Sequence, residues 1–329
     1  MEHALWFVGP RQVSLRPYEP GPLHPDEVRV RTTCSGVSAG TELLAYRGEL
    51  PTDLPVDEAI DALGDADFTY PFQYGYSAVG AVESIGEAVD GLAPGDQVFA
   101  FQPHQQTFDA PPSRLLPVPH LDPRHAVLLP YVETALQVTL DAGAVFAETV
   151  VVTGLGVLGT LVAQLLDRAG ATVLAVETQG WRRHLAGRLG IRAVAPDELA
   201  EALGAEPVHL GVECSGNPAA LRTMLAMLAH EGTALVASWY GTKPVELPLG
   251  LEFHRRRLLI RSSQVSTIPA RLSGRWTNRR RLEHAAELAA TLPLGELATD
   301  TIPFERADAA YAALDAGTEG VFHVALGYR

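Results

Sequence analysis

Lysine and cysteine are nearly absent from this chain, and both absences exclude kinds of site. Among 329 residues the one lysine is Lys243, in a Gly-Thr-Lys-Pro turn, so Schiff-base chemistry has a single and unfavourable candidate. The two cysteines, Cys34 and Cys214, are too few for a four-thiolate zinc site and indicate no disulfide framework. The chemistry of the chain must therefore come from other side chains.

Long apolar runs and a net positive charge are also lacking. No run reaches the ~20 apolar residues that span a bilayer. The first residues, Met-Glu-His-Ala-Leu-Trp, lack the basic flank and apolar core of a signal peptide, so we expect a cytoplasmic protein. The net charge of −14 argues against nucleic acid or an anionic membrane as a partner. The partner that we expect is a small-molecule substrate. The arginine runs 255–257 and 279–281 are interpreted as solvated or interface faces rather than anion sites.

A glycine-rich turn is the strongest signal in the sequence. The β-branched run 149–153 leads into Gly154, Gly156 and Gly159, and an apolar helical stretch follows directly. This order is typical of dinucleotide binding: the first glycine permits a tight turn, the second lets the backbone approach a pyrophosphate, and the third lets helix and strand pack closely. The helix N-terminus then offers N–H groups to the phosphates.

Glu177 indicates which nucleotide this turn would bind. It ends a second apolar strand, 172–176, at about the ~20-residue offset where an acid hydrogen-bonds the adenosine ribose. An acid there repels the 2′-phosphate of NADP, whereas Arg182 and Arg183 could pair with that phosphate. We therefore predict NAD(H), with NADP as the alternative.

The pattern of apolar residues predicts an α/β protein with a β-rich N-terminal part. Over about the first 120 residues, short alternating runs indicate antiparallel strands, with a small-residue loop at 34–42 and a loop with a short helix at 51–72 over a substrate opening. From residue 123 a helical stretch reaches 140, and near-continuous apolar strands then indicate a parallel sheet covered on both faces. These strands are expected near 149–153, 172–177, 192–195, 207–213, 232–238 and 257–262.

The end of the chain returns to strand-like sequence. A run at 299–304, an amphipathic helix through Leu314 and a run at 321–326 are expected to fold back onto the N-terminal β domain.

The chain has a β-rich N-terminal part, a nucleotide-binding middle and a C-terminal segment that returns to the first part. This order of segments resembles the medium-chain dehydrogenase/reductase superfamily of alcohol-dehydrogenase-like enzymes. Beside the glycine turn, the motifs that carry the resemblance are Gly95-Asp96-Gln97-Val98, residues 212–217 and residues 301–304. The resemblance implies a GroES-like catalytic domain of residues 1–122 and 294–329 and a Rossmann doubly wound domain of residues 123–293. The segments 35–42 and 75–80 are most similar to the bacteriochlorophyllide dehydrogenase branch, whose members oxidise a secondary alcohol on a large substrate.

The same resemblance shows where this chain departs from the zinc-dependent members. Those members hold a catalytic metal with a Cys from a G-x-C-G-x-D loop, a His-Glu pair from G-H-E, and a third Cys or Glu. Here Ser38 replaces the cysteine, Tyr76 the histidine and Ser77 the glutamate, and only Glu133 matches a ligand position. Because Zn²⁺ prefers thiolate and imidazole, we predict a zinc-free member with no metal site.

Without a metal, another group must polarise a carbonyl or relay a proton, and four residues are candidates. Tyr76 would donate to a developing alkoxide, with Ser38 beside it, or it fills the vacated metal space. His104 lies in a polar loop that we expect to face the cleft, or its position there is incidental. Glu133 is catalytic or braces the helix that carries it.

The predicted cofactor contacts follow the glycine turn and the later strand ends. Trp239 and Tyr240 follow such a strand end, where their rings would pack over the nicotinamide or the substrate, or at an interface. The contacts are Gly154, Gly156, Val157, Leu158, Gly159, Glu177, Arg182, Ser215, Ser238 and Ser263.

These observations favour a zinc-independent oxidoreductase that transfers hydride between NAD(H) and an alcohol or carbonyl substrate. Two alternatives stay open: an NADPH-dependent enoyl or quinone reductase of the same fold, and a non-catalytic nucleotide-binding protein. In the superfamily the edge strand corresponding to 257–262 often pairs across a dimer, so the resemblance also implies a homodimer.

Overall fold

The computed structural model describes residues 1–55, 60–64, 67–298 and 300–329, which form two compact units. Unit 1 comprises residues 1–130 and 286–329, and unit 2 comprises residues 131–285. The sequence placed the two boundaries after residues 122 and 293; the division into a catalytic and a nucleotide-binding domain by function stays a prediction. Within the described residues, no helix is long and apolar enough to cross a membrane.

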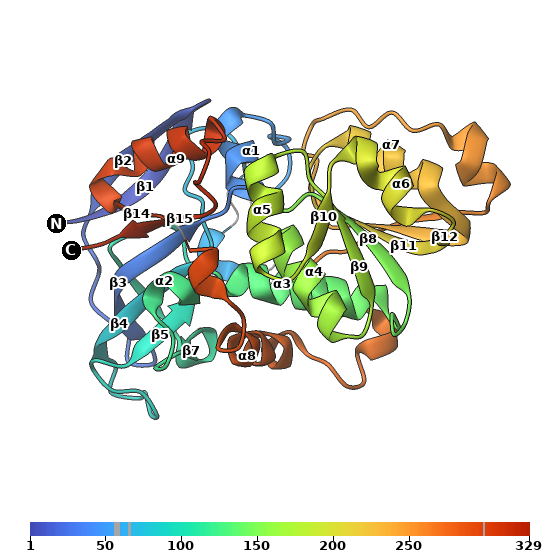
Figure 1. Ribbon diagram of the computed structural model, residues 1–329. Helices are drawn as coiled ribbons and strands as arrows, with labels where there is room; N and C mark the ends of the chain where they lie inside the picture. Colours follow the sequence, from blue (N-terminus) through green and yellow to red (C-terminus); the bar gives the residue numbers. More distant parts are fainter. Residues whose placement is uncertain (56–59, 65–66, 299) are drawn as a thin grey trace. The chain divides into compact units, whose positions relative to one another are not determined.

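Unit 2 is built on a six-stranded parallel sheet with the order β10-β9-β8-β11-β12-β13 (Figure 1). Numbered along the chain, this is the 3-2-1-4-5-6 order of the doubly wound nucleotide-binding fold, as predicted. Strand β8 lies in the middle, and its residues Val150, Val151 and Val152 are fully buried, as expected of a strand covered on both faces. The strands are β8 (Thr149–Thr153), β9 (Thr172–Val176), β10 (Arg192–Val194), β11 (Val208–Glu213), β12 (Leu228–Val236) and β13 (Leu259–Ser262).

Helices connect these strands and cover the sheet. Helix α4 begins at Val157, immediately after the glycine turn, and contacts β8 and β9, while α7 contacts β11 and β12. The helices of this part of the chain are α3 (Leu129–Ala142), α4 (Val157–Arg168), α5 (Gly180–Arg188), α6 (Leu199–Leu203), α7 (Pro218–Met227) and α8 (Asn278–Ala289).

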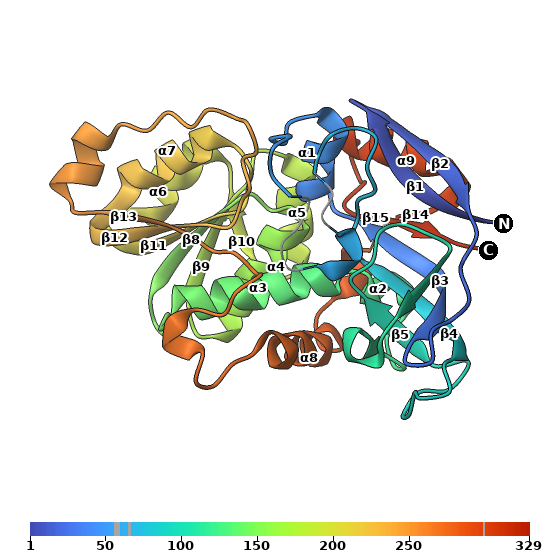
Figure 2. The same ribbon diagram turned by 180° about the vertical axis from the view of Figure 1, so that it is seen from behind.

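Unit 1 contains a second, mostly antiparallel sheet with the strand path β14-β15-β3-β4-β5-β7, with β6 paired to β3 and a separate β1–β2 hairpin (Figure 2). This β-rich unit is the GroES-like part that the sequence predicted. Its strands are β1 (Glu2–Gly9), β2 (Gln12–Tyr18), β3 (Val28–Val37), β4 (Ala78–Ile85), β5 (Gln97–Ala100), β6 (Thr107–Ala110), β7 (Leu116–Pro117), β14 (Asp300–Pro303) and β15 (Val324–Gly327).

The C-terminal segment returns to the N-terminal sheet, as predicted. Strand β15 pairs antiparallel with β3, and β14 extends the sheet beside β15. Between them, α9 (Ala307–Asp315) buries Ala307, Ala310, Tyr311 and Leu314 in one core with Phe7 of β1 and with aromatic residues from positions 46 to 74. The C-terminal segment therefore shares a hydrophobic core with the N-terminal part of unit 1.

Three local expectations need correction. Residues 34–37 are the end of β3 rather than a loop, because their small side chains fit a strand paired on both sides; the helix α1 (Thr41–Arg47) opens only after Gly40. The helical stretch from 123 is two helices, α2 (Pro123–Ala126) and α3, since Pro130 favours a fresh helix start. The last strand begins at Val324 instead of Val321.

Parts of two predicted segments lie outside the described residues. Of the loop at 51–72, residues 56–59 and 65–66 are not described, and a short 3₁₀ turn covers Asp61–Leu63. Of the strand predicted at 299–304, Thr299 is not described.

Candidate functional site

Two loops meet at the point where the strand order of unit 2 reverses, between β8 and β11. Gly154, after β8, has φ of +84°, and a Cβ atom on it would lie 2.5 Å from the Cα of Ser215, which follows β11. A Cβ on Gly159 would lie 1.8 Å from the carbonyl oxygen of Gly154, so the start of α4 needs glycine to pack there. Gly156 is open, with no atom closer than 4.0 Å to such a Cβ. The three glycines thus have the geometry of a pyrophosphate-binding turn, in which the second is the accessible one.

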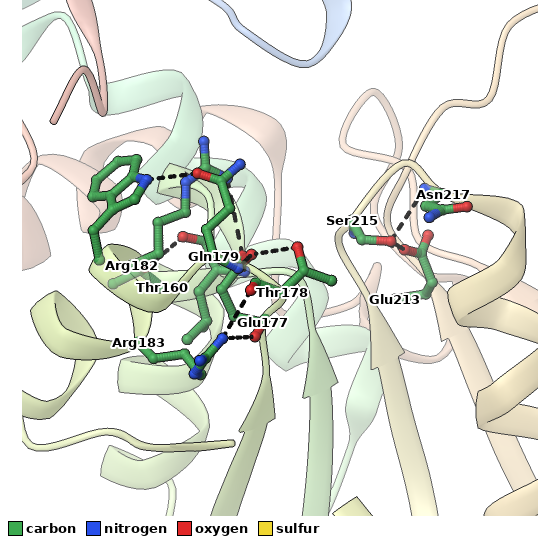
Figure 3. A network of polar contacts seen from close by, with 11 residues as sticks. Thr160, Glu177, Thr178, Gln179, Arg182, Arg183, Glu213, Ser215 and Asn217 are labelled. Carbon is green, nitrogen blue, oxygen red and sulfur yellow. Dashed lines mark hydrogen bonds and ion pairs between the residues drawn. The ribbon is translucent and has the colours of Figure 1, made fainter. Parts of the chain in front are cut away.

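Glu177 lies against this turn at the end of β9 (Figure 3). Its side chain is 5% exposed, and its Oε2 accepts a 2.8 Å hydrogen bond from the backbone N–H of Leu155. Its Oε1 accepts from the N–H of Gln179 at 2.8 Å and from the Thr178 hydroxyl at 3.1 Å. The carboxylate is therefore held by backbone donors beside the open glycine, where an adenosine ribose would need an acceptor.

Arg182 and Arg183 occupy different positions on the first turn of α5. The Arg182 Nη1 atom lies 3.9 Å from Glu177 Oε2, and it is also the atom nearest to a Cβ on Gly156. Burial lowers the pKa of Arg182, with Glu177 acting in the opposite direction. Arg183 donates instead to the carbonyl oxygens of Glu177 and Thr178. Of the two cations, Arg182 is the one placed at the glycine turn.

The remaining predicted cofactor residues lie at the start of α4 or at the carboxyl edge of the sheet. Val157 and Leu158 open α4 after Gly156. Ser238, after β12, accepts a 2.9 Å hydrogen bond from the N–H of Gly216 through its Oγ. Ser263, after β13, donates its hydroxyl to Asp141 at 2.7 Å, so this side chain is engaged by helix α3. Ser238 therefore lies beside the loop that contains Ser215, whereas the Ser263 hydroxyl is bonded to Asp141.

In unit 1, the structure brings two of the predicted catalytic residues into direct contact. The Tyr76 hydroxyl donates a 2.6 Å hydrogen bond to Ser38 Oγ, and it lies 3.3 Å from Thr41 Oγ1. Ser38 is 4% exposed, whereas Tyr76 is only half-buried. Ser77, at the third position of the Gly-Tyr-Ser segment, donates its hydroxyl to the carbonyl oxygen of Val127 at 2.7 Å.

A buried polar cluster supports this hydroxyl pair, and Glu42 is its centre. Glu42 has no exposed surface; its Oε1 accepts the N–H of Ser38 at 2.8 Å, and its Oε2 lies 2.9 Å from His104 Nε2 and accepts the hydroxyl of Tyr311. Burial and Glu42 raise the pKa of Tyr311 well above its usual value, which keeps that hydroxyl a donor. The sequence pointed to the segment that contains Glu42 but not to these contacts, because the partners lie 62 and 269 residues away.

The expectation that His104 faces a cleft is wrong. Its side chain has no exposed surface and is enclosed by Glu42 on one side and by Ser35 Oγ, 2.7 Å from Nδ1, on the other. Its ring also lies against Gly75, where a Cβ would come within 2.5 Å of His104 Cδ2. His104 therefore supports the backbone just before Tyr76 and offers no surface to a substrate.

Glu133 is held in an ion pair. Its Oε1 lies 3.0 Å from the guanidinium of Arg281, and the two side chains are 6% and 3% exposed. Burial raises the pKa of Glu133, and Arg281 partly offsets this. Arg281 also donates to Gln137 and to the carbonyl oxygen of Val265. Glu133 thus braces α3 against α8, and Arg281, expected on a solvated or interface face, is instead a buried partner.

The donor set at the metal-ligand positions does not fit zinc. The hydroxyls of Ser38 and Tyr76 bond to each other where zinc-dependent members present thiolate and imidazole, and Ser77 bonds a backbone carbonyl. In the part of the chain that the structure describes, no group of three or more His, Cys, Asp or Glu side chains is arranged to hold a metal ion. We therefore derive no step through a metal.

The two sheets and the glycine turn define the class: an α/β dehydrogenase fold of the alcohol-dehydrogenase type. Residues 157–291 match the family described as zinc-binding dehydrogenase. Two relatives are similar over most of the chain. D-guloside 3-dehydrogenase of Escherichia coli (strain K12) is 28% identical over 304 residues, 85% of each chain. The 2-desacetyl-2-hydroxyethyl bacteriochlorophyllide A dehydrogenase of Cereibacter sphaeroides is 28% identical over 329 residues, 94% of this chain and 93% of that one.

Solved structures show the same fold at low identity. A dehydrogenase of Escherichia coli CFT073 complexed with NADH has a TM-score of 0.78 at 17% identity over 99% of each chain. A zinc-binding dehydrogenase of Sinorhizobium meliloti 1021 bound to NADP has a TM-score of 0.76 at 21% identity, again over 99% of each chain.

The predicted resemblance to the medium-chain dehydrogenase/reductase superfamily is confirmed, and the chain is an oxidoreductase of this type. The bacteriochlorophyllide dehydrogenase, to which segments 35–42 and 75–80 are similar, is among its relatives. The alternative of a non-catalytic nucleotide-binding protein is set aside.

Proposed function

We propose that this protein transfers hydride reversibly between NAD(H) and an alcohol or carbonyl substrate without a metal ion. The observation that carries the proposal is the hydrogen bond between the Tyr76 and Ser38 hydroxyls, which occupy the positions of two metal ligands in zinc-dependent members. A phenol and a serine hydroxyl are poor ligands for Zn²⁺ but good proton donors and acceptors.

We assign the binding site of the cofactor to unit 2. The accessible backbone at Gly156 and the N-terminus of α4 would hold the pyrophosphate, and the Glu177 carboxylate would accept the adenosine ribose hydroxyls. When bound, the nicotinamide accepts or gives the hydride. NAD(H) is preferred over NADP(H), because a 2′-phosphate would meet the buried Glu177 carboxylate.

We assign the group that exchanges a proton with the substrate oxygen to unit 1. During carbonyl reduction, Tyr76 would turn its hydroxyl proton from Ser38 to the oxygen that becomes negative. The Ser38 hydroxyl would then donate to the phenolate that remains, and solvent would return the proton to Tyr76. During alcohol oxidation Tyr76 would first lose its hydroxyl proton to solvent, and its phenolate oxygen would then accept the proton of the alcohol. The partial exposure of Tyr76 and the burial of Ser38 suit this division, since only Tyr76 needs to reach a substrate.

The substrate is proposed to be a secondary alcohol carried on a larger molecule. The names of the two relatives refer to a guloside oxidised at its 3-position and to a hydroxyethyl group on a bacteriochlorophyllide. A D-guloside and 1-phenylethanol therefore serve as first probes, one with a ring hydroxyl and one with a hydroxyethyl group beside an aromatic ring.

The metal-free step is tested on protein dialysed against a chelator until elemental analysis finds no zinc. Hydride transfer from each probe is followed as NADH absorbance before and after dialysis. Undiminished turnover supports the proposal. Turnover that disappears on dialysis and returns with added zinc contradicts it.

The cofactor choice is tested by fluorescence titration with NADH and NADPH, using Glu177→Gln as the variant. The wild type is expected to bind NADH more tightly. In the variant, the ratio of the Kd for NADPH to the Kd for NADH should fall at least about tenfold, since a hydrogen bond to a charged group contributes ~1.5–3 kcal/mol. Glu206→Gln is the control, because this exposed carboxylate bonds Thr149 at the start of β8, the end of that strand away from the glycine turn. Tight NADPH binding without an NADH response would favour the enoyl or quinone reductase alternative.

A further inference from the structure

Glu213, the last residue of β11, is a buried carboxylate to which the proposed reaction assigns no role. It has no exposed surface, and both of its oxygens accept hydrogen bonds. Oε1 accepts from the N–H of Ser215 at 2.6 Å and from the Ser215 hydroxyl, and Oε2 accepts from the hydroxyl of Tyr240 at 2.7 Å. Since a buried charge must be compensated by such contacts, Glu213 holds Ser215 and the Tyr240 hydroxyl in place.

Glu213 thereby holds the Ser215–Gly216 turn in place. The Gly216 N–H donates to Ser238 Oγ at 2.9 Å, and the Asn217 N–H donates to Ser215 Oγ at 3.1 Å. Figure 3 shows Ser215, Asn217 and Glu213 gathered at the end of their strand, across from the group around Glu177. This turn also lies directly against Gly154 of the pyrophosphate turn.

The position of the Ser215–Gly216 turn assigns it to one half of the cofactor. In a doubly wound sheet the dinucleotide lies across the point where the strand order reverses, with one mononucleotide on each side. Glu177 follows β9 on one side, where it would take the adenosine ribose. The Ser215–Gly216 turn follows β11 on the other side and therefore faces the nicotinamide half.

Tyr240 lies on the loop after β12, and that loop is folded against the same turn. The N–H of Lys243 donates to the Tyr240 carbonyl oxygen at 3.2 Å, and Lys243 Nζ lies 3.5 Å from the Gly216 carbonyl oxygen. Burial, together with the Glu213 carboxylate, raises the pKa of Tyr240, so its hydroxyl stays protonated and donates.

From these contacts we propose that Tyr240, acting through Glu213, is a positioning residue that presets the Ser215–Gly216 turn for the nicotinamide half of the cofactor. The sequence expectation for Tyr240 was ring packing over the ligand or an interface; the hydroxyl bond to Glu213 gives it a different task. The inference rests on the proposed binding of NAD(H).

The experiment compares two ligands that differ only in the nicotinamide: NADH and ADP-ribose. Dissociation constants are measured for the wild type, Tyr240→Phe and Glu213→Gln, with thermal unfolding as the check on folding. We expect the Kd for NADH to rise about tenfold in Tyr240→Phe, as for the loss of one hydrogen bond to a charged group, while the Kd for ADP-ribose stays within about twofold. Glu213→Gln should show the same selectivity.

Glu177→Gln is the matched control, because it removes a charge from the adenosine side. It should weaken NADH and ADP-ribose alike. Equal losses for the two ligands in Tyr240→Phe would overturn the inference, and so would unchanged binding of both. A wild type that binds neither NADH nor NADPH would instead contradict the proposed function, so the two failures are distinct.

Discussion

The Tyr76 hydroxyl donates to the Ser38 hydroxyl across 2.6 Å, and the Ser38 backbone N–H donates in turn to the buried carboxylate of Glu42. One short segment of unit 1 therefore supplies both the partner of the phenol and the link that holds this partner in place. The arrangement gives the partly exposed Tyr76 a buried hydrogen-bond partner that is itself fixed by a buried carboxylate.

Removing the Tyr76 hydroxyl should abolish most of the activity and leave the cofactor site unaffected. We expect Tyr76→Phe to lower kcat by about 10²–10⁴-fold, the usual contribution of a positioned proton donor. NADH affinity, measured by fluorescence, should not change, because Glu177 and the glycine turn belong to unit 2. Tyr18→Phe removes a hydroxyl that bonds the Thr107 carbonyl oxygen and is the matched control. Undiminished turnover in Tyr76→Phe would remove Tyr76 from the mechanism.

Glu42 should matter for stability far more than an exposed acid does. In Glu42→Ala, His104, Tyr311 and the Ser38 N–H all lose a buried acceptor, so we expect a loss of about 3–5 kcal/mol in the free energy of unfolding. Glu83→Ala removes a surface partner of Arg31 and should cost at most ~1 kcal/mol. Urea unfolding of both variants measures the difference, and similar losses in the two would contradict the central place of Glu42.

The sequence predicted the parts of the fold and site whose signals are contiguous. The parallel strands and the glycine turn could be recognised because periodicity and glycine spacing act within a few residues. The pairing of Glu133 with Arg281 could not, since the two residues are separated by 148 positions and each alone resembles a surface charge. The same reason hid the burial of His104: its polar loop indicated exposure, whereas its partners come from other strands and helices.

His323 should make stability depend on pH. Burial lowers its pKa from 6.5 to about 3, so between these values the unfolded chain binds a proton that the folded chain does not. The free energy of unfolding therefore falls as the pH drops below about 6.5. From pH 7 to pH 5, this one group should remove about 2 kcal/mol. In urea unfolding at the two pH values, His323→Gln should lack that part of the decrease; a decrease as large as that of the wild type would contradict the assignment to His323.

The exposed edge of the unit 2 sheet predicts a homodimer. Strand β13 ends the sheet, and Leu259 and Ile260 on it are 60% and 37% exposed. An unpaired edge with apolar side chains is a template for a second strand, and a lysine on it opposes pairing. We expect light scattering after gel filtration to give a dimer for the wild type at tens of micromolar and a monomer for Ile260→Lys. Ile85→Lys, which places the same charge at a comparably exposed isoleucine of unit 1, should stay dimeric. A wild-type monomer would show that the edge is left open, and a dimer that survives Ile260→Lys would move the interface away from β13.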